Sequence, residues 1–284
     1  MSKRAKIAFM LCLVLAAVAV GYAAYHFTAN AIGQSIYDNL SVRANAEGTP
    51  SPTPEPTEEP IPTPDVTPEP TPEPTPEPTP EPYVSPIDWQ PLWDINPDVA
   101  AWLEIPGTRV AYPVLQHPYD NFYYLDYTID GRLTLPGSIY IFSNIKKDFS
   151  DYNIVIYGHN MIDESMFGSL KNYRYLSYMQ EYPDVDIYTP DGEYHYTIFG
   201  AVIYDDRLIS DSFDCNWEPD REAFLESLYA TAPAGSVFRE DVEVTTDDHI
   251  IVLSTCIAGA PNNRLLIVAV RNDPALAGAE GPQT

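Results

Sequence analysis

The sequence predicts a mainly β domain, a barrel or a sandwich, on three observations. Seven short apolar runs rich in Val, Ile and Tyr follow one another between residues 109 and 271, separated by Gly, Asp, Asn and Pro. A βαβ fold would alternate such runs with helical patterns, and only two stretches of this part are helical in pattern. Sixteen of the 29 prolines lie between Pro50 and Pro86, which leaves residues 83–272 for a single core.

The chain begins with a stretch suited to a membrane. Lys3, Arg4 and Lys6 precede the uncharged apolar run Ile7 to Tyr25. At about 1.5 Å per residue this run matches a bilayer core of about 30 Å, and the positive charges favour a cytoplasmic N-terminus. Residues 1–48 are therefore predicted to hold a cytoplasmic start, a transmembrane signal anchor at about 7–25 and a juxtamembrane segment. A secretory signal cleaved near residues 44–46 is the alternative.

Residues 49–86 form a low-complexity array of Thr, Pro and Glu without an apolar face. Proline fixes φ and removes a hydrogen-bond donor, so we expect an extended polyproline II stalk of about 3 Å per residue. Such a stalk would hold the following domain away from the membrane. Recognition of the array by a proline-binding module is the alternative interpretation.

The folded domain is predicted over residues 87–272. Asn96-Pro97-Asp98 is a helix-start signal, and Val99 to Leu103 is expected to form a short amphipathic turn that Gly107 ends. Strands are expected in the seven apolar runs, at residues 109–115, 137–142, 153–158, 185–190, 193–204, 249–254 and 264–271.

Two stretches of the domain have helical patterns. Asp163 is a plausible cap for a helix over Asp163–Tyr173, and a second helix is expected over Glu218–Ala232, where Phe224, Leu225 and Leu228 share one face. Residues 273–284 are small and polar, and we expect a disordered tail there.

Charge and cysteine content narrow the function classes. The formal net charge is −26, and most of it lies in the folded part, which argues against a nucleic-acid partner. Of three cysteines, Cys12 lies in the apolar run, whereas Cys215 and Cys256 belong to the domain. These two could form a disulfide, or one could be a reduced catalytic residue. Because no CxxC, HExxH or other metal-ligand spacing occurs, we expect neither a metal nor a cofactor.

Three side chains at the ends of predicted strands could carry chemistry. His159 follows Gly158 at the end of one run, Cys256 ends another, and Arg264 begins the next. Taken singly, each has a structural explanation: a core thiol, a histidine satisfied in a turn, an arginine at a strand end. Together they supply a nucleophile, a base and an oxyanion donor. Arg271 ends the strand that Arg264 begins, about 23 Å away at 3.3 Å per residue, so one arginine at most reaches the thiol.

Five segments in order resemble the class B sortases. They are NPDVAAWLEIPGTRVAYPVLQ (96–116), DNFYYLDY (120–127), YGHNM (157–161) with MFGSLKNY (166–173) behind it, LSTC (253–256) and the strand that Arg264 opens. The resemblance spans residues 87–271. It implies a closed eight-stranded β-barrel with an N-terminal helix and an additional helix before the cysteine strand, for which Glu218–Ala232 is the candidate.

The same resemblance implies a function. It suggests a single-pass, membrane-anchored cysteine transpeptidase with an extracellular catalytic domain. Its partners would be exported proteins with a C-terminal sorting signal and an amine from a peptidoglycan precursor or a pilin lysine. Cys256 would form a thioester with the substrate threonine, His159 would act as acid and then base, and Arg264 would hold the oxyanion or the substrate backbone. Four residues would line the peptide groove: Asn121, Leu125, Ser254 and Thr255.

Two alternatives use the same residues differently. A cysteine peptidase would transfer the acyl group to water, but papain-like enzymes place the cysteine before the histidine, whereas His159 here precedes Cys256 by 97 residues. The other alternative is a stalked surface-binding module without catalysis. Replacing Cys256 with Ala separates these cases, because binding would survive the change and acyl transfer would not.

Overall fold

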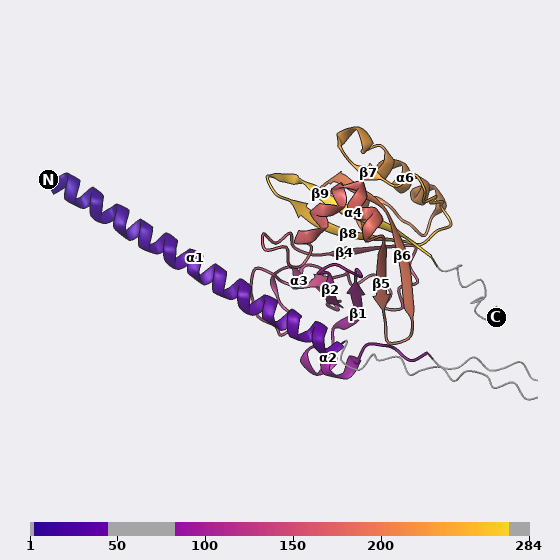
Figure 1. Ribbon diagram of the computed structural model, residues 1–284, viewed down its shortest axis with the longest axis horizontal. Coiled ribbons are helices and arrows are strands. Elements are labelled where there is room, and N and C mark those ends of the chain that lie inside the picture. Colours follow the sequence, from indigo (N-terminus) through magenta and orange to yellow (C-terminus); the bar gives the residue numbers. More distant parts are fainter. Residues whose placement is uncertain (1–2, 45–82, 273–284) are drawn as a thin grey trace, which may run out of the picture.

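The computed structural model of the chain describes residues 3–44 and 83–272. Figure 1 shows a long N-terminal helix, α1 (Lys3–Ala44), whose C-terminal end reaches a β-barrel near α2 (Trp89–Ile95) and α3 (Tyr123–Asp126). The predictions of a tail at residues 273–284, of a cleavage site near residue 45 and of most of the stalk concern positions outside the described residues.

The barrel is a closed ring of eight strands. Around the ring the order is β5-β1-β2-β3-β4-β8-β9-β6, and pairing of β6 with β5 closes it. A ninth strand of the described residues, β7, pairs with β6 outside the ring. The strands are β1 (Val99–Glu104), β2 (Ala111–Leu115), β3 (Ile139–Tyr140), β4 (Asn153–Tyr157), β5 (Asp184–Tyr188), β6 (Glu193–Asp205), β7 (Val237–Phe238), β8 (Ile250–Ile257) and β9 (Ala260–Arg271). The expected eight-stranded barrel is thereby confirmed.

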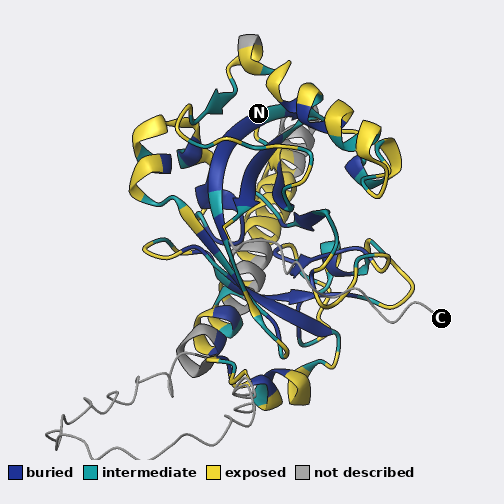
Figure 2. Cartoon of the chain, turned by 90° about the vertical axis from the view of Figure 1, so that its right-hand side faces the viewer, coloured by how far each residue is buried: buried dark blue, intermediate teal, exposed yellow. Residues whose placement is uncertain are grey.

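Strands β8 and β9 are buried on both faces, which explains their continuous apolar sequences. Alternate residues such as Leu253 and Ile267 belong to the core inside the barrel. Their neighbours Val252 and Val268 belong to a second apolar cluster outside it, together with Phe224 of α6 (Glu218–Tyr229). Because successive side chains of a strand point to opposite faces, helix α6 covers the outer face that β8 and β9 would otherwise expose. Figure 2 shows the buried strands enclosed by exposed helices and loops.

All seven predicted strand runs form strands, but the opening of the domain differs from the prediction. Val99–Leu103 is not an amphipathic turn; it is most of strand β1, in which Trp102 and Leu103 are both fully buried. A strand buried on both faces lacks the alternation that identifies strands. Asn96 does not start a helix either: it ends α2, and its side chain accepts a hydrogen bond from the backbone of Asp98.

The first expected helix, Asp163–Tyr173, begins later than predicted. Asp163 accepts hydrogen bonds from both the backbone and the hydroxyl of Ser165, which holds a turn, and Glu164 and Met166 have positive φ. A short 3₁₀ helix, η1 (Gly168–Arg174), then leads into α4 (Leu176–Glu181). The second expected helix is α6, which ends at Tyr229, before the short 3₁₀ turn η2 (Ala232–Ala234); helix α5 (Ile209–Ser212) precedes it.

Helix α1 combines exposed and buried apolar residues. Seven apolar side chains in its first half are more than half exposed: Met10, Leu13, Val14, Leu15, Val18, Val20 and Tyr22. Near its C-terminal end Tyr37 and Leu40 are buried in the main core of the barrel. Within the described residues, no helix has the length and apolar character that crossing a membrane requires.

Candidate active site

Cys256 and Arg264 are directly opposed partners on the antiparallel strands β8 and β9. Opposed residues point to the same face of a sheet with their Cα atoms about 5 Å apart, so the turn around Gly259 returns the arginine to the thiol. The six residues before Cys256 are buried, whereas Cys256 is exposed. The pairing register between β8 and β9 shifts directly after Cys256, and such irregularities can re-aim a side chain. Cys256 and Cys215 are both free thiols, so the disulfide considered from the sequence does not form.

Arg264 does not begin its strand as predicted: β9 starts at Ala260, so Arg264 lies inside the strand and Arg271 is its last residue. Arg264 donates from Nη1 to the carbonyls of Pro261 and Asn263, at 2.9 and 3.0 Å, which holds the guanidinium against the first residues of β9. Arg271 pairs with Tyr196 at the far end and stacks 4.1 Å from the centre of the Tyr194 ring. The structure therefore brings Arg264, and not Arg271, beside Cys256.

Three hydrogen bonds fasten the segment around His159 to β8. The Gly158 amide donates to the Ser254 carbonyl at 3.2 Å, and the Thr255 hydroxyl donates to the Gly158 carbonyl at 2.7 Å. On the other side of the histidine, Asn160 Nδ2 donates to the Cys256 carbonyl at 2.8 Å. Since these bonds flank His159 on both sides, its backbone runs beside the end of β8 where the thiol is exposed.

The His159 ring is oriented by a backbone carbonyl. Its Nε2 lies 2.8 Å from the carbonyl oxygen of Leu125 in α3. A carbonyl only accepts hydrogen bonds, so Nε2 must carry a proton. Nδ1 is then the ring nitrogen that can take up or release a proton during a reaction. The sequence did not reveal this partner, because a backbone carbonyl leaves no mark on residue type.

The four residues expected in the peptide groove have varied surroundings. Asn121 accepts a hydrogen bond from the Ser143 amide at 2.8 Å, and Leu125 is partly buried against the core. Ser254 and Thr255 are buried, and the Thr255 hydroxyl is engaged by Gly158. Asn121 thus contacts the loop after β3 through its side chain, and Leu125 contacts the His159 ring through its backbone carbonyl. A groove role for the four stays a prediction.

A cleft runs along β4, the strand that lies parallel to β8. Its floor includes Asn153, Val155 and Tyr157, alternate residues of β4 that point to the same side. The walls come from the turn after β3 and from the connection between β6 and α6: Phe142, Asn144, Ile145, Asp151, Tyr152, Ser210, Phe213, Asp214, Cys215 and Asn216. Tyr157 at one end of the floor pairs with Ser254, two residues before Cys256, although none of the lining residues belongs to β8.

The second thiol of the domain lies in the wall of this cleft. Cys215 is partly buried, and Asn153 Nδ2 lies 3.8 Å from its sulfur. Burial raises the pKa of the Cys215 thiol above its ordinary value of 9.0. A protonated thiol is a poor nucleophile, so Cys215 is the less suited of the two domain thiols to catalysis.

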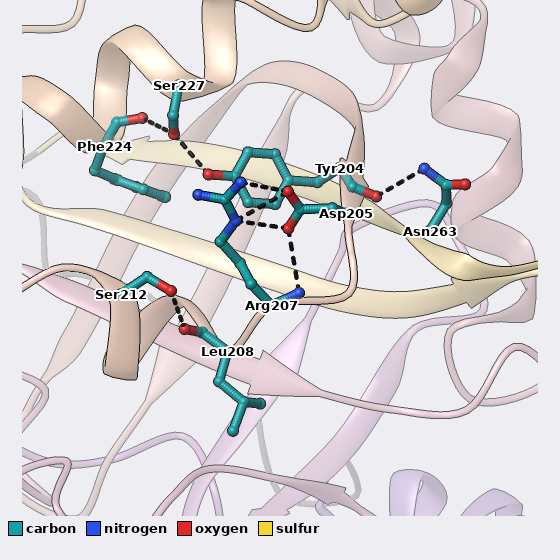
Figure 3. Close-up of polar contacts among 8 residues, drawn as sticks. All are labelled: Tyr204, Asp205, Arg207, Leu208, Ser212, Phe224, Ser227 and Asn263. Carbon is teal, nitrogen blue, oxygen red and sulfur yellow. Dashed lines mark hydrogen bonds and ion pairs between the residues drawn. The ribbon is translucent and has the colours of Figure 1, made fainter.

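The connection that forms one wall is anchored next to Arg264. Tyr204 of β6 pairs with Arg264 across the sheet. Its hydroxyl lies 2.7 Å from the Ser227 hydroxyl of α6, and its carbonyl accepts from Asn263 Nδ2 at 3.2 Å. Figure 3 shows both contacts. The same view shows Arg207 paired with Asp205 at the start of the connection. Helix α6 is thereby tied to the strand ends that carry the candidate site.

A neutral phenol lies close to the thiol. Tyr140 stacks on Tyr157, with the ring centres 5.4 Å apart. Burial raises the pKa of Tyr140, and the nearby acidic groups of Tyr157, Asp126 and Cys256 raise it further. Tyr140 therefore stays protonated at neutral pH and adds no negative charge beside the thiol.

Comparisons with known proteins point to one family. A family model of the sortase domain matches residues 103–272. Sortase B of Listeria monocytogenes is 32% identical over 162 residues, which cover 57% of this chain and 64% of that protein, just under two thirds of its length. Sortase B of Staphylococcus aureus is 31% identical over 180 residues, 62% of this chain and 70% of that protein. The structure of the S. aureus sortase B–substrate complex, 28% identical, superimposes with a TM-score of 0.57 and covers 64% of this chain and 83% of that one.

Proposed function

The chain belongs to the sortase family, and on that premise we propose that it is a class B cysteine transpeptidase acting on sorting signals of exported proteins. The observation that carries the proposal is the exposed thiol of Cys256 directly opposite Arg264, with the His159 segment hydrogen-bonded to the same strand end. Nucleophile, base and oxyanion donor are then present around one substrate bond.

In the first half of the reaction, the Cys256 sulfur attacks the carbonyl carbon of the substrate threonine as a thiolate. The new C–S bond gives a tetrahedral intermediate whose negative oxygen faces the Arg264 guanidinium. The intermediate collapses as the C–N bond breaks. His159 Nδ1 gives its proton to the departing amine, and a thioester remains on Cys256.

In the second half, an amine attacks the thioester carbonyl. His159 Nδ1, now without a proton, accepts one from the attacking nitrogen. The C–S bond breaks, and the sulfur leaves as the thiolate. A new amide joins the threonine to the acceptor, and the starting enzyme is regenerated. The hydrogen bond from Nε2 to the Leu125 carbonyl keeps Nδ1 as the reacting nitrogen in both halves.

The cleft along β4 suits the peptide that precedes the threonine. An extended chain that enters along β4 reaches the end of β8, where Cys256 is exposed. A sortase B relative has been solved as a complex with its substrate, which supports a peptide ligand of this kind. The acceptor would be an amine of the peptidoglycan precursor or a pilin lysine.

We also propose that the N-terminal run holds the enzyme at the cell membrane with the barrel outside. The run Ile7 to Tyr25 carries no charge and follows Lys3, Arg4 and Lys6. Exposed apolar side chains along the first half of α1 support this placement. Full-length protein should stay in the membrane pellet after extraction with alkaline carbonate, and proteases added to intact cells should reach the barrel. Release by carbonate would contradict the anchor.

The catalytic proposal is tested with the full chain in detergent micelles. The protein is incubated with peptides that carry candidate sorting motifs with threonine at the scissile bond, with and without an amine such as triglycine. Intact-mass spectrometry should detect a thioester that maps to Cys256, and ligated product should form only with the amine. Cys256→Ala should abolish both, whereas Cys12→Ala, at an exposed thiol of α1 outside the cleft, is the matched control and should retain both. Hydrolysis that no amine redirects would identify a peptidase instead.

A further inference from the structure

The end of helix α1 packs behind the loop that orients His159. Tyr37 is 1% exposed, and its hydroxyl donates to the Gly137 carbonyl at 2.7 Å. The same hydroxyl lies 2.9 Å from the Ser138 hydroxyl and accepts from the Ile129 amide at 3.4 Å. Tyr37 thus ties together both ends of the loop that runs from α3 to β3.

Gly137 also lies against the Leu125 carbonyl, which accepts the hydrogen bond from His159. Gly137 has φ +52°, and a Cβ at this position would come within 2.2 Å of the Leu125 carbonyl oxygen. That oxygen accepts the hydrogen bond from His159 Nε2 at 2.8 Å. The Leu125 carbonyl is therefore confined between the backbone of Gly137 and the imidazole, so a shift of residue 137 changes where the ring is held.

Helix α1 also touches the other side of the histidine loop. The Tyr37 ring packs edge-on against Tyr112, with ring centres 5.6 Å apart. The Tyr112 hydroxyl accepts from the Met166 amide at 2.9 Å, and the next amide, of Phe167, donates to the His159 carbonyl at 2.9 Å. Tyr37 therefore reaches the histidine by two separate paths, one through the ring nitrogen and one through the backbone.

We propose that Tyr37 is a positioning residue for His159, so that the docked end of the N-terminal helix is part of the catalytic apparatus. The inference rests on the proposed transpeptidase function. Residues 45–82 separate α1 from the rest of the domain in sequence, yet Tyr37 is as buried as the residues of the barrel core. A buried hydroxyl with three partners fixes a loop more tightly than apolar packing does, because each bond has a direction.

The test removes only the hydroxyl, in the full-length protein. Tyr37→Phe keeps the ring against Tyr112 and leaves the Gly137 carbonyl without its donor. Acyl transfer from a sorting-motif peptide to triglycine should lose about tenfold in kcat through misplacement of the base, whereas KM for the peptide should stay unchanged. Rates are compared at a temperature where thermal melts show every variant fully folded.

Two variants of the same helix separate positioning from stability. Leu40→Ala removes a buried side chain, 3% exposed in the native protein, without touching the hydrogen bonds of Tyr37. It should lower the melting temperature and retain the native kcat. Tyr22→Phe makes the same chemical change on a tyrosine that is 67% exposed, and it should change neither quantity.

Three results would overturn the proposal: native kcat in Tyr37→Phe, an equal loss of kcat in Leu40→Ala, or a loss in Tyr37→Phe that appears in KM alone. Failure of the proposed function is a different result, because the unmodified enzyme would then form neither thioester nor ligated product. Native activity in the unmodified chain together with a selective loss of kcat in Tyr37→Phe supports both.

Discussion

The backbone of Gly137 lies against the carbonyl oxygen of Leu125, the oxygen that accepts the hydrogen bond of His159. A side chain at residue 137 would need space that this oxygen occupies. The glycine is thereby required twice, for its left-handed φ of +52° and for the close approach.

Gly137→Ala should therefore damage both stability and catalysis. The added methyl group must displace the Leu125 carbonyl, and we expect a loss of about 2 kcal/mol in the free energy of unfolding from crowding and backbone strain. Gly131→Ala is the control, because Gly131 has φ +76° with open space around its Cβ position. It should cost about 1 kcal/mol of backbone strain and leave kcat unchanged. Urea melts and transpeptidation rates measure the two effects, and equal losses of kcat would contradict the role of the carbonyl.

Arg264→Lys tests whether the planar guanidinium is needed. Lysine keeps the charge but lacks the forked donors that can bind the carbonyls of Pro261 and Asn263 and an oxyanion at the same time. We expect kcat/KM for the sorting peptide to fall by about a hundredfold, the usual effect of removing one oxyanion donor. Arg271→Lys, at the other end of β9, should leave it within about twofold of the native value. If the two variants lost activity equally, the assignment of Arg264 would be wrong.

The two thiols of the domain should differ in their reaction with iodoacetamide. Cys256 is exposed, whereas Cys215 is partly buried and has a raised pKa. We expect Cys256 to be alkylated at least about tenfold faster at pH 8. A raised pKa means that the thiol stays protonated to higher pH, so the reaction of Cys215 should keep accelerating above pH 9. Peptide mapping at each pH measures both rates, and earlier alkylation of Cys215 would show that the cleft wall opens in solution.

Stability should depend on pH through Glu104. Burial raises its pKa, and so does the charge of Asp186, its partner across β1 and β5. A carboxyl with a raised folded-state pKa favours folding when protonated, so this contribution is present below the unfolded pKa of about 4.3 and is lost as the pH rises. Glu104→Gln should therefore stabilise the protein at pH 7 by about 0.5 kcal/mol, and the gain should vanish near pH 4.

The pKa of Glu164 is shifted in the opposite direction to that of Glu104, so its effect on stability should depend on pH in the opposite way. Its hydrogen bond and ion pair with Lys171 lower its pKa, so its contribution is present at pH 7 and is lost as the pH falls. Glu164→Gln should consequently lower the melting temperature at pH 7 rather than raise it. A gain in melting temperature for both variants would indicate a general effect of negative charge instead of two local ones.

The sequence predicts the fold correctly where an element has a distinctive composition and clear turn residues at its ends. Strands such as β4 and β8 are short, rich in Val and Ile, and bounded by turn residues, so their positions follow from composition. Strand β1 could not be recognised in this way, because Ala100 and Ala101 carry little strand preference and neither face is solvated. Helix α2 has only seven residues, one of them proline, which is too few to show a period.

The residues of the candidate site likewise fall into those that the sequence can reveal and those that it cannot. Cys256, His159 and Arg264 could be selected from the sequence because their side chains have distinctive chemistry, and their catalytic roles stay a prediction. The carbonyl of Leu125 could not, because any residue type has one. The contribution of Tyr37 could not be predicted either. A low-complexity array separates it from the domain in sequence, and no sequence pattern links the two segments. The packing that joins them is a property of the folded chain alone.

The parallel strands β4 and β8 are far apart in the sequence, so the ribosome makes the two halves of the candidate site at different times. Residues 158–249 lie between these strands, and β9 follows both. A ribosome that has made everything up to residue 249 has supplied the imidazole of His159, but neither Cys256 nor Arg264. Closing such a distant contact is slow compared with forming hairpins. A product stalled before residue 256 would therefore lack the sulfur that we propose is acylated, and it could not attack other proteins by this mechanism.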